Sequence, residues 1–301
     1  MSRGILYFIG VTTASSSIMK VFPKWADALG LDAEIKGIDL PLHAPAEEYR
    51  KVVDFIKNDP LSKGALVTTH KIDLFEACKD MFDFIDPYAQ ALGEVSCLSK
   101  LENCFRAHAK DPISSGLALE HFVPKNFWKD HGGEVLLLGA GGSSLAMSLY
   151  FSQERHGDNI PKKITIGNRS TPRLESAKRH LADVRVNMEY KHGPQPRNND
   201  EFISGLPPYS LIVNATGLGK DAPGSPTTDA VLYPQNSLVW EINYRGDLIF
   251  MDQALAQKDA KNLTIEDGWV YFIHGWTQVI SEVFHIPIEG EMLEKLSEIA
   301  K

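Results

Sequence analysis

The chain has 301 residues, 43% hydrophobic and 23% charged, as in an ordinary globular protein of about two domains. Its 31 basic and 39 acidic side chains give a net charge of −8, which argues against nucleic acid or a membrane surface as a partner. No uninterrupted apolar stretch approaches the roughly 20 residues that span a bilayer, and no cleavable leader is expected. Cys78, Cys97 and Cys104 form no close metal pair and leave one cysteine unpaired, so we expect a cytoplasmic protein without a metal site.

Strand and helix patterns alternate through the first third of the chain. Strands are expected at 4–12, 33–41, 64–69, 95–101 and 104–109, and helices at 16–31, 46–58, 71–82 and 84–93. Because helices of this length separate the early strands, the connections are crossover units, which build a mostly parallel sheet.

A lysine stands at the carboxyl end of the third strand, in the stretch GALVTTHK (64–71). Open α/β sheets bind ligands at the carboxyl ends of their strands, so Lys71 is a candidate for an amine that exchanges a proton. The alternative is a solvated loop lysine, since most lysines are exposed.

A second alternation begins after Asp111-Pro112. A connecting helix is expected at 113–123, a strand, turn and helix at 134–151, a helix at 173–184, and strands at 162–170, 184–191, 209–217 and 237–244; 192–200 is expected to be a loop, and 269–299 is helical with a break at 285–287. We place the domains at 1–111, 112–265 and 266–301. The last helices are expected to return to the first domain, because a nucleotide-binding unit is complete without them.

A glycine turn lies directly between a strand and a helix, in the run Gly139-Ala140-Gly141-Gly142-Ser143-Ser144. Gly139 permits a tight turn, Gly141 lets the backbone approach a pyrophosphate, and the helix N-terminus supplies amide donors. The same pattern also occurs in purely structural turns. The strand–turn–helix context favours a dinucleotide site.

The next strand indicates which dinucleotide would bind. NAD sites commonly end this strand with an acid that accepts from the ribose hydroxyls. This chain has Asn168-Arg169-Ser170 there, with Arg173 one turn further. Guanidinium groups pair well with phosphate, so NADP(H) is favoured, although these arginines could instead be solvated at a helix start. Asn214 and Thr216, in the run NATGLG after another buried strand, suit a loop against the nicotinamide half.

In this order the motifs resemble those of the shikimate dehydrogenase family, over nearly the whole chain. The segments that carry the resemblance are GALVTTHK, GEVSCL, AKDPISSG, GAGGSS, NRS, NATGLG, EINYRG and the C-terminal DGW followed by a glutamine. The resemblance implies an α/β protein in which an N-terminal substrate domain with a mostly parallel sheet accompanies a Rossmann NADP-binding domain. It also implies a cofactor contact at Gly268.

The family's catalytic lysine and aspartate fall on Lys71 and Asp111. The resemblance implies that both contact the hydroxyl being oxidised. A lysine whose pKa is lowered by burial and raised by a carboxylate can be tuned for acid–base work. The structural alternative for Asp111 is a helix N-cap before Pro112.

The substrate contacts that the resemblance implies are less regular. Its Ser-x-Ser carboxylate site falls on Ser15 and Ser17, although a count without a gap would use Ser16 and Ile18, and a serine-rich helix cap suits either register. Leu66 and Ser96 stand where the family has asparagines that bond ring hydroxyls, and their loss removes polar contacts. The further substrate-binding residues expected are Thr68, Ser96, Tyr244 and Gln278. Tyr271 and His274 could replace lost contacts or pack in their helix.

We therefore expect an NADP-dependent alcohol dehydrogenase for a shikimate-like cyclic hydroxy acid, acting as a monomer or homodimer. Leu66 and Ser96 leave open a different substrate on the same scaffold, such as quinate, an aminated ring or a folate derivative. A third hypothesis is an NADP-binding sensor without activity. Hydrolysis is disfavoured because a GxSxG elbow and a suitable carboxylate pair are missing.

Overall fold

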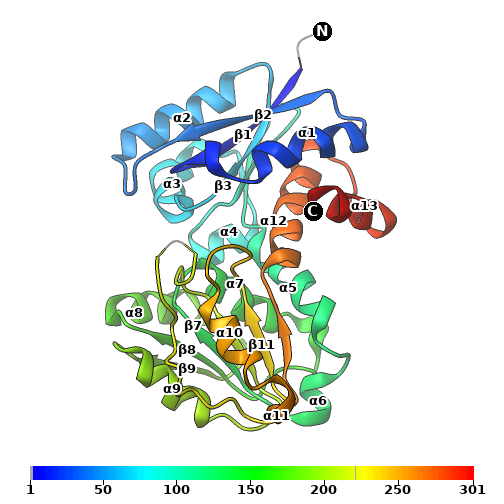
Figure 1. The fold of residues 1–301 in the computed structure, drawn as a ribbon. Helices are drawn as coiled ribbons and strands as arrows, with labels where there is room; N and C mark the ends of the chain where they lie inside the picture. The colour runs from blue at the N-terminus through cyan, green and yellow to red at the C-terminus, as the bar shows by residue number, and fades with distance from the viewer. Residues whose placement is uncertain (1–2, 221) are drawn as a thin grey trace. The chain divides into compact units, whose positions relative to one another are not determined.

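The computed structural model describes residues 3–220 and 222–301, which form two compact units. Unit 1 contains the described residues up to Lys110 together with Gly275–Lys301, and unit 2 is Asp111–His274 (Figure 1). The domain limits expected from the sequence were 111/112 and 265/266. The second limit of the compact units lies nine residues later, inside a continuous helix.

The described part of unit 1 is built on a six-stranded mixed sheet. Its order is β2-β1-β3-β5-β6-β4, with β5 antiparallel to β3 and to β6 and the other pairs parallel. The strands are β1 (Gly4–Gly10), β2 (Ala33–Asp39), β3 (Ser62–Val67), β4 (Phe84–Ile85), β5 (Cys97–Leu101) and β6 (Cys104–His108). The helices are α1 (Ile18–Leu29), α2 (Ala46–Asn58), α3 (Lys71–Cys78), α4 (Pro87–Leu92), most of α12 (Trp269–Phe284) and α13 (Gly290–Ala300), with short 3-10 turns at Thr13–Ser15 and Lys79–Met81.

Two apolar helix faces hold unit 1 together. The face of α2 that carries Tyr49, Val53 and Ile56 packs into one core with β1 and β3. In α1, Trp25 is fully buried and its Nε1 donates to the carbonyl of Leu296 in α13, 2.7 Å away. Each large side chain buried in this way contributes about 1.5–3 kcal/mol.

Unit 2 contains, among its described residues, a six-stranded parallel sheet in the order β9-β8-β7-β10-β11-β12. The strands are β7 (Val135–Leu138), β8 (Ile164–Asn168), β9 (Met188–His192), β10 (Leu211–Asn214), β11 (Leu238–Glu241) and β12 (Thr264–Glu266). The helices are α5 (Asp111–Phe122), α6 (Phe127–His131), α7 (Gly142–Phe151), α8 (Thr171–His180), α9 (Pro196–Ser204), α10 (Ile249–Leu255) and α11 (Lys258–Lys261), with a 3-10 turn at Glu154–His156.

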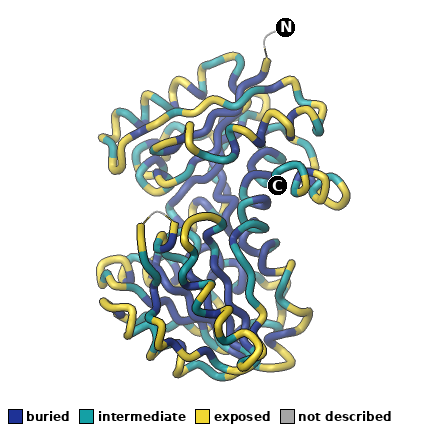
Figure 2. The backbone as a smooth tube through the Cα atoms, viewed as in Figure 1, coloured by how far each residue is buried: buried dark blue, intermediate teal, exposed yellow. Residues whose placement is uncertain are grey.

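The central strands of unit 2 are buried along their whole length, as parallel sheets covered on both faces require (Figure 2). The strand order is the Rossmann arrangement. Successive strands are added toward one edge of the sheet from β7 to β9 and toward the other edge from β10 to β12, so the order reverses between β7 and β10. In such sheets the ligand crevice lies at the carboxyl ends of the strands beside this reversal. The predicted α/β class with a Rossmann unit is confirmed.

Two local expectations were wrong. The helix expected at 84–93 begins only at Pro87, because Phe84 and Ile85 form β4 and pair with β6. The loop expected at 192–200 contains the start of α9, where Pro196 occupies the first turn. Proline suits that position, since its missing N–H would be unsatisfied there in any case.

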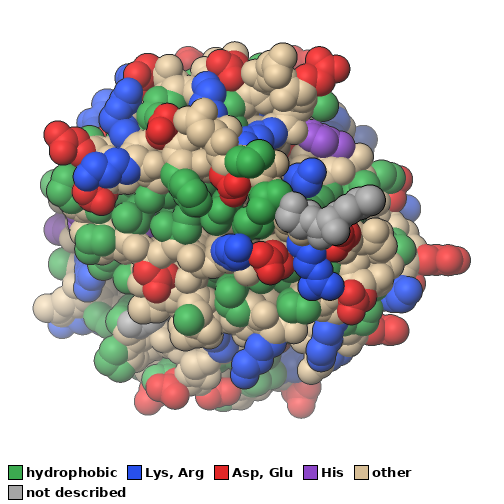
Figure 3. Space-filling model, turned by 90° about the horizontal axis from the view of Figure 1, so that it is seen from above, with side chains coloured by type: hydrophobic (Ala, Val, Ile, Leu, Met, Phe, Trp, Pro, Cys, Tyr) green, Lys and Arg blue, Asp and Glu red, His purple; other side chains and the backbone are tan. Residues whose placement is uncertain are grey.

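The surface mixes charges of both signs. On the face shown in Figure 3, basic and acidic side chains are interspersed with hydrophobic ones. No helix within residues 3–220 and 222–301 is both long enough and apolar enough to cross a bilayer. Within the same residues, no group of three or more His, Cys, Asp or Glu side chains is placed to hold a metal ion.

Candidate functional site

A pocket of about 600 Å³ lies in unit 2 at the carboxyl ends of its parallel strands. Eight of the twelve predicted cofactor residues line it: Gly139, Ala140, Gly141, Asn168, Arg169, Ser170, Arg173 and Thr216. The remaining lining residues are Gly167 in β8 and residues of the segments that follow β9 and β10, including the start of α9. The pocket therefore occupies the position where a Rossmann unit binds its ligand.

The glycine turn forms the floor of this pocket. Gly139 has φ +115°, and a Cβ there would stand 2.6 Å from the carbonyl oxygen of Ala215. At Gly141 a Cβ would meet nothing within 4 Å, so the missing side chain leaves open space in front of the first turn of α7. Ser144, in place of the third glycine, is fully buried and donates from Oγ to the carbonyl of Gly139, 2.6 Å away. Open space in front of a helix N-terminus is the feature that a pyrophosphate site requires.

The end of β8 presents two exposed guanidinium groups to the pocket. Arg169 and Arg173 both line it, and among the described residues neither forms an ion pair. Ser170 caps α8 by accepting from the backbone N–H of Arg173. No carboxylate ends β8, so this part of the site suits a phosphate better than two ribose hydroxyls.

The loop after β9 forms a wall that the sequence reasoning missed. Gly193, Pro194, Gln195, Pro196 and Asn199 line the pocket. The side chain of Asn199 donates to the carbonyl of Pro226, but its Oδ1 is buried without a hydrogen-bond partner in the described structure. That oxygen offers an acceptor to a ligand N–H, such as the amino group of an adenine. The signal for this wall in the sequence was the pair Gly193-Pro194, directly after β9.

Four predicted cofactor residues do not line the pocket within the described chain. Asn214 is fully buried beneath it and bonds to Glu241. Ser143 accepts a long 3.4 Å hydrogen bond from Tyr271 Oη. At Gly268 a Cβ would collide with the carbonyl of Ile242, which gives that glycine a packing reason. The fourth is Gly142, the first residue of α7.

In unit 1, the predicted substrate residues gather after parallel neighbouring strands. β1 and β3 pair with Ile9 opposite Val67, so the segments that follow them leave the same edge of the sheet. Ser15 and Ser17 follow β1, and Thr68 and Lys71 follow β3. The backbone links this edge further, because Thr68 N donates to the carbonyl of Ile9 and Val95 N donates to that of Lys71.

The structure bears on the register of the two serines. Ile18 is fully buried in α1, so the ungapped register would assign a core side chain to the substrate. Ser17 is the N-cap residue of α1 but makes no side-chain capping hydrogen bond. Ser15 is exposed and donates to the carbonyl of Thr12. These observations favour Ser15 and Ser17, and their substrate role stays a prediction.

The backbone just before Lys71 is unusual. Thr69 has φ +52°, a left-handed conformation that β-branched residues rarely adopt and that collects at functional sites. The next residue, His70, is almost fully buried, and its Nδ1 lies 3.0 Å from Tyr49 Oη. Lys71 is half-buried and begins α3. The left-handed turn at Thr69 and the buried His70 thus constrain the backbone directly before Lys71.

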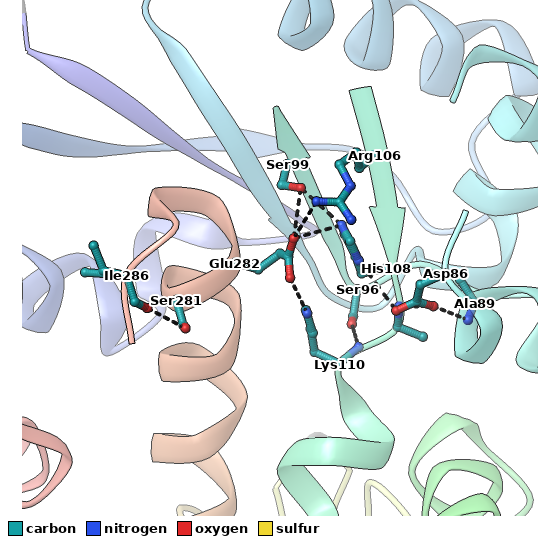
Figure 4. A network of polar contacts seen from close by, with 11 residues as sticks. Asp86, Ala89, Ser96, Ser99, Arg106, His108, Lys110, Ser281, Glu282 and Ile286 are labelled. Carbon is teal, nitrogen blue, oxygen red and sulfur yellow. Dashed lines mark hydrogen bonds and ion pairs between the residues drawn. The ribbon is translucent and has the colours of Figure 1, made fainter. Parts of the chain in front are cut away.

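A charged network lies at the end of β6, where the chain leaves unit 1 (Figure 4). Glu282 of α12 accepts from Lys110 Nζ at 2.6 Å and lies 3.2 Å from His108 Nε2 and 3.6 Å from Arg106 Nη1. Burial raises the pKa of Glu282, but the Lys110 hydrogen bond and these cations outweigh it and hold that pKa below its usual value. Ser96 Oγ accepts from Lys110 N, so this hydroxyl also anchors the backbone.

The other predicted residues lie in one unit or the other. Asp111 is buried at the start of α5 and is the first residue of unit 2, whereas Lys71 belongs to unit 1. A pairing of these two side chains would involve residues of both units, and it stays a prediction. Gln278 is half-buried on α12, and Tyr244 is half-buried against Phe272, with ring centroids 4.5 Å apart.

Tyr271 and His274, which could replace lost substrate contacts or pack in their helix, also lie on α12. The ring of Tyr271 packs edge-on against Trp240, with centroids 5.7 Å apart. Burial lowers the pKa of His274 to about 4, so this imidazole is neutral near pH 7. Its role in binding stays a prediction.

No family model matches the chain. In sequence it is 24% identical over 272 residues to a protein named shikimate dehydrogenase (NADP(+)) from Methylobacterium radiotolerans, covering 89% of this chain and 86% of that one. In structure it is similar to shikimate 5-dehydrogenase from Listeria monocytogenes, solved with shikimate and NAD, with a TM-score of 0.75, 15% identity and coverage of 99% and 96%. The chain has the shikimate dehydrogenase fold.

A second solved structure extends this likeness. The fold is also similar to quinate dehydrogenase from Corynebacterium glutamicum in complex with NAD, with a TM-score of 0.75, 18% identity and coverage of 99% of this chain and 98% of that one. The resemblance to the shikimate and quinate dehydrogenases that the motif order indicated is confirmed. Since the solved neighbours include enzymes of different name, the fold alone leaves the substrate open.

Proposed function

We propose that this protein is an NADP-dependent dehydrogenase that oxidises a secondary hydroxyl of a shikimate-like cyclic hydroxy acid, or reduces the corresponding ketone. The observation that carries the proposal is the pocket in unit 2, where the Gly139–Gly141 turn and the arginines after β8 line one cavity. The NADP(+) named for the Methylobacterium relative and the full-length fold similarity support it.

Each half of the cofactor has candidate partners. The cradle at Gly141 and the first turn of α7 would hold the pyrophosphate, and Arg169 and Arg173 a 2′-phosphate. Asn199 offers an acceptor, and Thr216 lies in the wall that continues from β10. When bound, NADP⁺ supplies the hydride acceptor.

Lys71 and Asp111 would carry out the proton transfer that accompanies hydride transfer. Oxidising an alcohol to a ketone releases a hydride and a proton, and the Lys71 amine would take the proton from the hydroxyl oxygen. The Asp111 carboxylate would hold the amine and the hydroxyl in place. Ser15 and Ser17 would donate to the substrate carboxylate, and Thr68, Ser96, Tyr244 and Gln278 would contact the remaining ring groups.

A different ring substrate is the second candidate. Leu66, 9% exposed at the end of β3, offers no hydrogen bond, and Ser96 Oγ already accepts from Lys110 N. A ring hydroxyl that finds no partner is penalised, so a substrate with fewer or differently placed hydroxyls is favoured. Cofactor absorbance should be followed with shikimate, quinate, an aminated analogue and a folate-like compound, each with NADP⁺ and NAD⁺. NADPH binding without turnover of any compound would point to a sensor.

The decisive variant is Lys71→Ala. Because it removes the proton acceptor, we expect turnover to fall by at least about 10²-fold while NADPH affinity stays unchanged. The exposed Lys79, at the end of the same helical segment, gives the control Lys79→Ala, which should retain turnover. Full activity of Lys71→Ala would exclude the proposed acid–base role.

A further inference from the structure

A fully buried acid lies beneath the cofactor pocket. Glu241 ends β11 and is 0% exposed. Its Oε2 accepts from Asn214 Nδ2 at 2.6 Å, and its Oε1 accepts from the backbone N–H and the Nδ2 of Asn243 at 2.9 and 2.7 Å. Burying a charged carboxylate is costly unless donors surround it, and here three N–H groups do so.

The hydrogen bonds continue from this acid into the wall of the pocket. Asn214 Oδ1 accepts from both the N–H and the Oγ1 of Thr216, at 3.1 and 2.6 Å. Thr216 Oγ1 in turn accepts from Leu218 N at 3.2 Å. Asn243 Nδ2 also donates to the carbonyls of Thr216 and Leu218, each at 3.3 Å. Both Thr216 and Leu218 line the pocket.

We infer that Glu241 is a positioning residue: its charged carboxylate fixes Asn214 and Asn243, and through them the Thr216–Leu218 wall in its cofactor-binding shape. A carboxylate can accept all three N–H donors, whereas a protonated acid would turn an O–H toward one of them. The inference rests on the proposed function, since it assigns this wall to the cofactor. Glu241 itself does not touch the pocket in the described structure.

Glu241 is expected to change its charge within the pH range in which binding can be measured. Burial raises its pKa to about 7, against the opposing effect of the Asn243 and Asn214 hydrogen bonds. Among the described residues, the ionisable groups on adjoining segments include Tyr233 before β11, Glu266 on β12, Asp267 after it, Tyr271 on α12 and Asp252 on α10. The pKa of Tyr233 is raised by burial first and then by the charges of Asp200 and Glu241, while burial first raises that of Glu266.

These signs give opposite pH dependences for binding and for stability. NADPH affinity should rise with pH as Glu241 ionises, between about pH 6 and about pH 8. Its contribution to folding has the other sign: a raised folded pKa means that the native state binds more protons, so stability falls as pH rises from about 4.3 through 7. A purely structural role for Glu241 would still give the stability dependence, but it would leave NADPH affinity independent of the ionisation of Glu241.

The test is NADPH affinity of the full chain, measured by fluorescence titration across this pH range. In Glu241→Gln the amide NH₂ faces donors, so we expect affinity at the alkaline end to fall about tenfold and the rise with pH to flatten. The matched control is Glu266→Gln, which removes a half-buried acid on the neighbouring strand and should keep the wild-type profile. The phosphate of NADPH also titrates in this range, but it does so equally in every variant, so comparing the affinities of the variants at each pH removes its contribution.

Wild-type affinity and pH profile in Glu241→Gln would overturn the inference, as would an equal change in Glu266→Gln. Should Glu241→Gln fail to fold, Asn243→Ala decides, because it removes the side chain that joins Glu241 to both wall carbonyls and should weaken NADPH about tenfold. Unchanged binding in Asn243→Ala would then reject the inference. Absence of NADPH binding in the wild type would instead refute the proposed function.

Discussion

Two arginine side chains carry the choice of dinucleotide at the scale of single residues. Arg169 and Arg173 are exposed at the pocket and make no ion pair in the described chain, so they are available to a phosphate. Because a hydrogen bond to a charged group contributes about 1.5–3 kcal/mol, Arg169→Ala should weaken NADP⁺ about 10–100-fold and leave NAD⁺ nearly unchanged.

Ratios of kcat/KM for the two dinucleotides measure this effect. Arg179→Ala is the control, since that side chain is exposed near the C-terminal end of α8, the helix that follows Arg169. A parallel loss with both dinucleotides in Arg169→Ala would show that the guanidinium supports the fold or the pyrophosphate, and the assignment to a 2′-phosphate would fail.

Individual residues show which parts of the site could be predicted from the sequence. The glycine turn was predicted because strand, turn and helix are contiguous, and Gly139, Ala140 and Gly141 do line a pocket. The left-handed backbone of Thr69 was not, since a threonine carries no sign of positive φ. Nor was Glu241, whose role depends on Asn214, 27 residues away. Such partners come together only through the pairing of β10 and β11.

At the scale of elements, α12 is joined to β6 by buried charges. Glu282→Gln would leave Lys110 Nζ without the carboxylate that it contacts and would remove one of the two acids beside His108, the other being Asp86 at 3.6 Å. We expect unit 1 to lose about 1–2 kcal/mol, discounted because the Glu282 side chain is 19% exposed. Chemical denaturation near neutral pH measures the loss, and Glu291→Gln, an exposed acid on α13, should change little.

The pH dependence of this effect has a definite sign. The folded pKa of Glu282 is lowered, so its contribution is complete above about pH 4.3 and is lost as pH falls through the folded value. The difference between wild type and Glu282→Gln should therefore shrink in acid. A difference that stays constant into acid would contradict the ion-pair explanation.

Sequence patterns predicted long helices and strands better than short ones. The parallel strands β7, β8, β10 and β11 of unit 2 were visible as apolar runs, whereas β12 was not predicted; the break between α12 and α13 was placed correctly. β4 was missed because two residues give no periodicity, and they become a strand only by pairing with β6. The start of α9 was missed because its polar residues lack an apolar stripe.

At the scale of the whole molecule, two compact units with separate cores give a thermodynamic prediction. NADPH should stabilise unit 2, whose residues form the pocket, by about 2.7 kcal/mol when its free concentration is 100 times Kd. For a unit of this size the melting temperature should rise by about 5–10 °C. Calorimetry measures the shift and hydrogen exchange locates it; protection confined to β1–β3 of unit 1 would contradict the assignment.

The contact between the glycine turn and the wall limits how this pocket can be redesigned. Because a methyl group at position 139 would press on the carbonyl of Ala215, any side chain there displaces the segment that Glu241 holds. A mutant library aimed at new dinucleotide analogues should leave that position untouched. Its diversity belongs at Gln195, which lines the pocket from the segment after β9 and is exposed.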